Sequence, residues 1–390
     1  MVHAASRVGL AEVLRRHGPA YLAAHPLSVA KAKVWRAIVA CRTAALGGQV
    51  QTCDACGTTR HLYRSCRNRH CPRCQTRAKE AWLAARRREL LPVPYFHLVF
   101  TLPHDLNGLI GQCPRALYEL LFGAVSATLT EFAANRRWLG GTPAFSLVLH
   151  TWKQDLGRHV HAHALMAGGA LKSDGNWVAP RRGFLFPVKA LSKVFRGKFV
   201  AALTAARQDG KLQQPDPAEH AWHDLLTRLH QHDWVVYAKE PLGGPAQVLD
   251  YLGRYTHRVA ISNERILGMD GETVRLRVRD SANGKHRRML RLPAQTFIER
   301  FLLHVLPKGF KRIRHYGLIG PAHKAACLAA ARAALDAPAP DPVVLESVAA
   351  FMCRIEQYER LRCPHCGGRF VPTAPIAPVP LPLLHLRGPP

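Results

Sequence analysis

Residues 150–165 read HTWKQDLGRHVHAHAL, and this stretch decides how the middle of the chain folds. The apolar residues around it predict two strands, 145–152 and 160–166, and the short connection between them is typical of an antiparallel hairpin. Side chains alternate between the faces of a strand, so His161 and His163 lie on one face while the alanines beside them pack on the other. Since neutral imidazoles are common metal ligands, the pair predicts a metal site on a sheet.

The alternative is that these histidines only pack. However, His159 adds a third histidine to the run, and burial penalises the charged form of each imidazole. So much titratable nitrogen in one apolar strand favours a functional interpretation.

Helical and strand-like segments alternate along the rest of the chain. The patterns predict helices at 10–24, 29–46, 75–90, 115–132, 218–231, 245–255 and 293–305, and strands at 95–102, at 234–239 and within 258–278. Strands interspersed with helices predict an α+β fold with a mainly antiparallel sheet flanked by helices. Pro92 and Pro94 end the third helix, which places a boundary near residue 92. We therefore expect a basic, helical and zinc-binding domain at 1–92, a catalytic domain at 93–325, and an Ala/Pro-rich, partly disordered tail at 326–390.

The second motif is YLGRY at 251–255, within a predicted helix. Residues four apart on a helix lie about 5 to 6 Å from each other, so Tyr251 and Tyr255 share a face, with Arg254 and Arg258 nearby. A metal-binding strand and a helix with paired phenols together predict covalent phosphodiester chemistry. In the alternative interpretations both rings pack on the core, or one is the nucleophile and the other packs or positions DNA.

The chain contains 11 cysteines, which we interpret as metal ligands because the number is odd and no secretion signal is apparent. Cys53-x2-Cys56 and Cys71-x2-Cys74 are two knuckles whose spacing predicts one structural zinc site, and Cys66 and His70 are alternative ligands. A further knuckle follows near the C-terminus. It either makes a second zinc site together with Cys353, or it is a remnant that binds no metal. That knuckle is Cys363-x2-Cys366, and the isolated cysteines Cys41, Cys113 and Cys327 are expected in the core.

The formal net charge of the chain is +29, which favours a polyanionic partner. From Arg60 to Arg88 there are ten Lys or Arg residues and one acidic residue. Because cationic side chains bind phosphates, this stretch, which contains predicted zinc ligands, predicts a phosphate-binding face that includes Arg67, Arg69 and Arg73. A merely solvated basic surface is the alternative. No run of 18 apolar residues is present, so we expect a cytoplasmic protein without a membrane partner.

Four longer motifs resemble the rolling-circle transposases of the insertion-sequence-91 family, in the superfamily named for its His-hydrophobic-His motif. They are SCRNRHCPRCQ at 65–75, HLVFTLP at 97–103, YLGRYTHRVAISN at 251–263 and RIRHYG at 312–317, and the resemblance covers roughly residues 10–325. It implies a DNA strand transferase of the two-tyrosine type, built from a single-strand endonuclease core and a small helical, zinc-ribbon-like domain before it. The DNA would be single-stranded, at the element ends and the target.

The resemblance also implies roles for particular residues. His161 and His163 would hold a catalytic Mg²⁺ or Mn²⁺, with Gln154 as the first candidate for the third ligand and His159 as the second. A phenol with a pKa near 10 is a weak nucleophile, so this ion must polarise the phosphate that Tyr251 or Tyr255 attacks. The attack would leave a 5′-phosphotyrosine and a free 3′-OH. The phosphates beside the cut would be bound by Arg254, His257 and Arg258.

Two other function classes remain open at this point. A plasmid-type replication initiator or relaxase would use the same chemistry at a different DNA site. A non-catalytic zinc protein that binds nucleic acid would use His161 and His163 only structurally. For the transposase, we expect a bacterial protein associated with the nucleoid.

Overall fold

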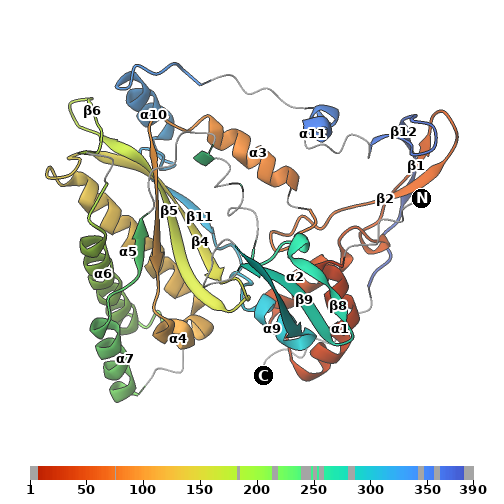
Figure 1. The fold of residues 1–390 in the computed structure, drawn as a ribbon, viewed down its shortest axis with the longest axis horizontal. Coiled ribbons are helices and arrows are strands. Elements are labelled where there is room, and N and C mark those ends of the chain that lie inside the picture. The colour runs from red at the N-terminus through yellow and green to blue at the C-terminus, as the bar shows by residue number, and fades with distance from the viewer. Residues whose placement is uncertain are drawn as a thin grey trace.

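The chain folds into an α+β structure with three antiparallel sheets, as predicted (Figure 1). Every strand pair among the described residues is antiparallel. The computed structural model describes residues 8–74, 76–181, 185–212, 218–238, 247–248, 253, 259–279, 286–340, 347–354 and 361–381.

The largest sheet is built around the predicted hairpin, which is confirmed. In it β4 (Thr142–Trp152) pairs with β5 (Arg158–Leu171). The strand order is β11-β4-β5-β3-β7, and β6 pairs with the end of β5. The bounds of the other strands are Tyr95–Thr101 for β3, Trp177–Val178 for β6, Val236–Ala238 for β7 and Ile313–Gly317 for β11.

Helices cover one face of this central sheet and bury the largest core of the molecule. Phe100, Phe145 and Ala164 point to this face and are fully buried against α5 (Pro114–Ala134) and α6 (Val188–Gln208). Pro114 suits the first turn of α5 because its missing N–H would have no partner there. Further cover comes from α4 (Asn107–Gln112) and α7 (Glu219–Gln231). The histidines of the hairpin point to the opposite face.

A second core joins the N-terminal helices to residues far along the chain. It contains α1 (Leu10–Ala24), α2 (Val29–Ala40), α9 (Ala294–Leu302) and a three-stranded sheet, β8 (Ile266–Asp270), β9 (Thr273–Arg279) and β10 (Arg287–Pro293). Asn263 accepts a hydrogen bond from the Leu10 amide at 3.1 Å across this contact. The buried turn residue Leu156 of the β4–β5 hairpin also belongs to this core. The domain bounds at 92 and 325 stay a prediction. This core contains residues from both sides of residue 92.

A third, smaller core lies on the histidine face, at one end of the central sheet. There α3 (Thr76–Arg87) and α10 (Lys324–Ala333) lie near the strands (Figure 1). Leu165 of β5 and Val248 belong to the same cluster of buried side chains. Of the predicted helix 245–255, residues 247, 248 and 253 are described and are helical.

The third sheet joins a hairpin of the N-terminal region to a strand near the C-terminal end of the described chain. Its order is β12-β1-β2, formed by β1 (Gly48–Cys53), β2 (Thr59–Tyr63) and β12 (Phe370–Ile376). Within the tail that was expected to be partly disordered, β12 is an ordered strand, which pairs with β1 along its length. A short helix, α11 (Val348–Arg354), precedes it. Among the residues placed by the structure, no helix has the length and apolar character needed to cross a membrane.

Candidate metal centres

Three histidines meet on the face of the central sheet opposite α5 and α6. His150 of β4 lies directly opposite His161 of β5 in the ladder, and His163 is two residues further along β5. Paired residues of antiparallel strands point to the same face, so all three rings lie together. One ring nitrogen from each lies within 4.8 Å of the other two. This spacing fits three ligands of a single divalent ion.

The surroundings favour the neutral form of His161 and His163 and orient the rings of the group. Burial, with His159 nearby, lowers the pKa of His161 to about 4, and burial also lowers the pKa of His163 well below its ordinary value. The Nδ1–H of His161 donates to the carbonyl oxygen of His159 at 2.9 Å, which leaves Nε2 as its metal-binding atom. Nδ1 of His163 lies 2.9 Å from Nε2 of His97, and the two rings stack. Trp152 stacks on His150.

The structure changes the third member of the predicted site. Gln154 lies exposed in the hairpin turn, where its carbonyl oxygen accepts a hydrogen bond from Arg265. His159 is also outside the three-histidine group, and its Nδ1 lies 3.2 Å from Nε2 of His104. The third histidine of the group is His150 instead. The prediction missed it because a cross-strand partner depends on the register of the hairpin, which residue spacing alone does not reveal.

The predicted nucleophiles and their neighbours lie outside the described residues, so their assignment stays a prediction. They are Tyr251, Tyr255, Arg254, His257 and Arg258. Two described residues of the same segment are placed. Val248 is fully buried in the core on the histidine face, and a Cβ on Gly253 would lie 3.0 Å from Lys79 and Leu83 of α3.

The first group of cysteines is Cys41, Cys66, Cys71 and Cys74, whose sulfur atoms lie within 4.8 Å of one another. Sγ of Cys66 and Sγ of Cys74 are 3.7 Å apart. A tetrahedral zinc with Zn–S bonds of about 2.3 Å requires sulfurs about 3.8 Å apart, so the group fits this metal. The prediction that Cys41 is only a core residue is therefore wrong.

His70, the other alternative ligand, stands outside this group. Burial, with Arg69 nearby, lowers its pKa to about 3. Its Nε2 accepts a hydrogen bond from the Leu306 amide at 3.2 Å, and its Nδ1 lies 3.0 Å from the side chain of Asn68. His70 thus attaches the cysteine loop to the segment after α9, and Cys66 is the alternative that joins the cluster.

The predicted pairing of Cys53 and Cys56 with Cys71 and Cys74 is also wrong. Cys53 and Cys56 group with Cys363 and Cys366 instead. The reason is the β1–β2 hairpin, in which Gly48 pairs with Tyr63 and the first knuckle lies at the opposite end. Five residues of strand span about 17 Å, too far for one metal ion. The C-terminal knuckle is accordingly not isolated, and Cys353 is absent from the group.

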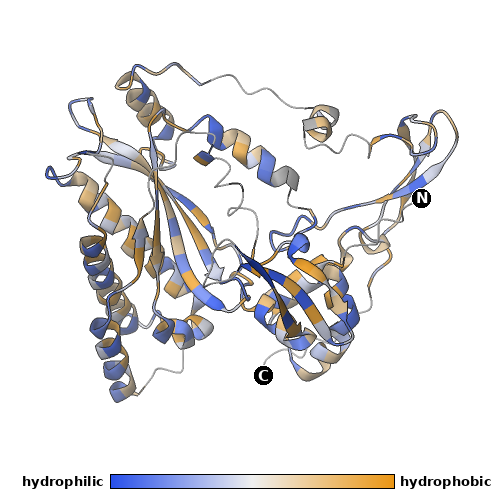
Figure 2. Ribbon diagram, in the orientation of Figure 1, coloured by the Kyte–Doolittle hydropathy of each residue, from blue (hydrophilic) through white to orange (hydrophobic). Residues whose placement is uncertain are grey.

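Exposed arginines form two basic regions. Arg67, Arg69 and Arg73 are exposed as expected for a phosphate-binding face, although Arg69 donates to the Phe310 carbonyl at 2.6 Å. Their role in DNA binding stays a prediction. The second region was not predicted and lies on β9 and β10, where hydrophilic and hydrophobic residues alternate (Figure 2). Its outward arginines, here named the arginine face, are Arg275, Arg277, Arg279, Arg287 and Arg291.

The pairing of β9 with β10 creates the arginine face. Arg279 lies opposite Arg287, and Arg275 lies opposite Arg291. The intervening Val274, Leu276 and Val278 are buried in the second core. An ion pair with Asp270 at 3.2 Å holds Arg275. The alternation along β9 was visible in the sequence, but not the partner strand that doubles the charge.

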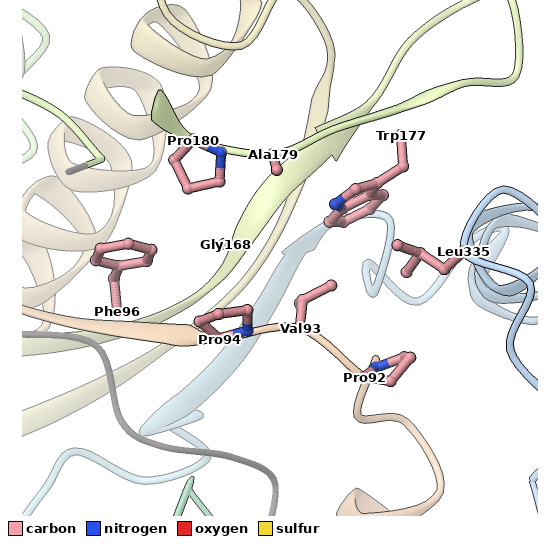
Figure 3. A pocket seen from close by; sticks show the side chains of 9 residues that line it. All are labelled: Pro92, Val93, Pro94, Phe96, Gly168, Trp177, Ala179, Pro180 and Leu335. Atoms are coloured by element: carbon pink, nitrogen blue, oxygen red, sulfur yellow. The ribbon is translucent and has the colours of Figure 1, made fainter. Parts of the chain in front are cut away.

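One apolar cavity, of about 270 Å³, lies beside β3 and β5 (Figure 3). Pro92, Val93 and Pro94 line it together with Phe96, Trp177 and Leu335. It offers no carboxylate, thiol or imidazole to bind a metal. The histidine centre is therefore the stronger candidate for catalysis.

The comparisons with known proteins agree with this architecture. A family model described as “Putative transposase” matches residues 144–326, and one described as “Transposase zinc-binding domain” matches residues 13–102. The putative transposase y4qJ of Sinorhizobium fredii is 44% identical over 367 residues, covering 92% of this chain and 92% of the relative. The transposase for insertion sequence element IS801 of Pseudomonas savastanoi pv. phaseolicola is 27% identical over 359 residues, covering 90% of this chain and 85% of the relative. The chain belongs to the insertion-sequence-91 family of transposases.

Proposed function

We propose that this transposase cuts and rejoins single-stranded DNA by a rolling-circle mechanism, through a 5′-phosphotyrosine intermediate. The observation that carries the proposal is the three-histidine group of His150, His161 and His163 on one face of the central sheet. A group with only a packing role would not need three convergent imidazoles, two of them with a pKa lowered by burial. We propose Mg²⁺ or Mn²⁺ as its ion, since imidazole ligands suit Mn²⁺ whereas Mg²⁺ prefers oxygen ligands but is abundant in cells.

The bound ion would polarise the scissile phosphate and stabilise the charge that develops on the leaving oxygen. His150, His161 and His163 would hold it, while His97 and the His159 carbonyl keep two of the rings in place. The phenol oxygen of a tyrosine forms a bond to phosphorus, and the bond from phosphorus to the 3′ oxygen breaks. The phenol loses a proton in this step and the leaving 3′ oxygen gains one, which gives a free 3′ hydroxyl. Attack by the 3′ hydroxyl of a DNA strand on the phosphotyrosine reverses these steps, so rejoining requires no nucleotide cofactor.

Tyr251 and Tyr255 are the proposed nucleophiles. The placement of Val248 supports this, because it belongs to the same buried cluster as Leu165, which lies two residues after His163 on the same face of β5. The chain that carries both tyrosines therefore starts from the histidine side of the sheet. Two phenols at one metal would allow one cut end to be held while a second strand is cut.

The described surface also offers a path for the DNA backbone. A cavity of about 440 Å³ adjoins the hairpin turn, and Lys153, Arg158 and Arg300 are among its lining residues. The turn is fixed to the second core, because Arg300 donates to the Asp155 carbonyl at 2.9 Å. The arginine face belongs to the sheet of that same core. We propose that single-stranded DNA contacts this face while its scissile phosphate lies at the histidines.

The relatives are named as transposases, which favours a transposase over the other kind of enzyme with this chemistry, a plasmid-type replication initiator or relaxase. A non-catalytic zinc protein would not require the histidine centre. Action on element DNA would place the protein with the bacterial nucleoid.

The decisive experiment is a search for a covalent protein–DNA adduct. Purified protein is incubated with end-labelled single-stranded DNA carrying the element ends, with Mg²⁺ or Mn²⁺, and separated on a denaturing gel. We expect an adduct with the wild type and with each single variant, Tyr251→Phe and Tyr255→Phe, on some substrate. Phenylalanine keeps the ring but removes the nucleophilic oxygen, so the double variant should form none while still binding DNA.

Strand transfer should fail in both single variants if two nucleophiles are needed. Normal transposition by Tyr251→Phe would show that Tyr255 works alone. An adduct that persists in the double variant would place the nucleophile elsewhere. Activity without any divalent ion would refute the role of the histidine centre.

A further inference from the structure

The two knuckles Cys53-x2-Cys56 and Cys363-x2-Cys366 have the same backbone geometry. In the first, the Gly57 amide donates to the Cys53 carbonyl at 3.1 Å, and in the second the Gly367 amide donates to the Cys363 carbonyl at 2.9 Å. Gly57 has φ of 72° and Gly367 has φ of 75°, a left-handed conformation that suits glycine. Two segments more than 300 residues apart thus fold into the same turn around a cysteine pair.

The knuckles face each other closely. Sγ of Cys53 lies 3.4 Å from Sγ of Cys366, and Sγ of Cys56 lies 3.6 Å from Sγ of Cys363. These distances are too long for disulfide bonds of about 2.05 Å and close to the edge of about 3.8 Å expected for a tetrahedral zinc thiolate site. All four sulfurs lie within 4.8 Å of one another.

The backbone next to the sulfurs is shaped for this contact. Asp54 donates its amide to the Arg369 carbonyl at 2.9 Å, and its carboxylate accepts from the Arg369 amide at 2.8 Å. A Cβ on Gly368 would lie 2.7 Å from Sγ of Cys53, so only glycine allows the two knuckles to approach this closely.

We propose that Cys53, Cys56, Cys363 and Cys366 bind a second zinc ion, here named the zinc clasp, which fastens the C-terminal segment to the β1–β2 hairpin. Four thiolates in a closed tetrahedron are the ligand set of a structural zinc site. The clasp is separate from the group formed by Cys41, and its C-terminal half lies beyond both matched family regions, 13–102 and 144–326.

The small sheet needs such a fastening because it has little hydrophobic core. Along β12 only the two end residues are partly buried, and the five between them are exposed. Along β2 no residue is buried, although the guanidinium of Arg60 lies 3.7 Å from the centre of the Phe370 ring. None of the three buried clusters contains a described residue of β1, β2 or β12. Sheets this small usually depend on a metal or disulfide for stability.

The first test counts thiolate-bound metal in the full chain. The protein is loaded with Co²⁺, and its thiolate-to-cobalt charge-transfer absorption is measured, a signal to which the histidine centre does not contribute. Two four-cysteine sites predict that Cys363→Ser/Cys366→Ser loses half of the signal. Cys327→Ser, a matched cysteine outside both groups, should keep all of it. An unchanged signal in the double serine variant would overturn the proposal.

The second test does not depend on the folding of a cysteine variant. A protease site is inserted after Pro340, in an exposed stretch, and the purified protein is cut there. The zinc clasp predicts that the C-terminal piece remains bound during gel filtration and is released when a chelator removes the metal. Because a chelator also reaches the Cys41 group, the Cys41→Ser/Cys66→Ser variant serves as a control that should retain the piece.

Two results of this second test would refute the clasp. The first is release of the piece from metal-loaded protein. The second is retention in chelator together with fewer than 11 titratable thiols after denaturation, which would show disulfides between the knuckles.

Discussion

Removing charge from the arginine face should weaken the salt dependence of DNA binding by a calculable amount. Arg277, Arg279, Arg287 and Arg291 are exposed on neighbouring strands, whereas Arg275 is held by Asp270. If each of the four contacts one phosphate, their replacement by alanine should reduce the slope of log K against log salt by about 2.8, from about 0.7 per contact on a single strand. Between about 50 and about 200 mM salt, the wild type should then lose about 50-fold more affinity than the variant.

Fluorescence anisotropy with a labelled single strand, titrated at several salt concentrations, measures this slope. The matched control removes four exposed cations from the helical layer behind the central sheet, namely Arg136, Arg137, Lys189 and Lys193. Both variants lose the same net charge, so a general effect of charge would change both slopes equally. Equal slopes in the two variants, or an unchanged slope in the arginine-face variant, would refute the proposed DNA path.

Two further predictions concern the metal site and the second core. His150→Ala should abolish adduct formation but preserve DNA binding, because a proposed metal ligand is lost while the basic surfaces remain. Gln154→Ala should still form the adduct. The reverse pattern in the gel assay would restore Gln154 as the third ligand. Gly18→Ala should lower the free energy of unfolding by about 1 to 2 kcal/mol, since the gain in helix propensity is smaller than the cost of overpacking. Its Cβ would lie 2.5 Å from the buried Trp35 ring, and increased stability in chemical denaturation would contradict this packing.

Local patterns of the sequence predicted many of the elements, although not α6, β1, β2 or β12, and they predicted the two histidines of the β5 strand. Alternation placed His161 and His163 on one face, and apolar periodicity predicted the helix that the structure shows as α5. These predictions succeed because strand and helix periods act over a few residues and depend little on the rest of the molecule. The same applies to the knuckles, whose Cys-x2-Cys spacing defines a local turn.

Only the tertiary structure decided which of these parts meet. His150 joins the histidine centre through the register of β4 with β5, and Cys53 finds Cys366 instead of Cys74 because a hairpin carries the first knuckle away. Likewise, the apolar face of α1 belongs to a core that includes both its sequence neighbour α2 and residues from Val259 onward. In each case the partner is chosen by long-range strand pairing and burial, which depend on the whole chain and leave no fixed spacing in the sequence.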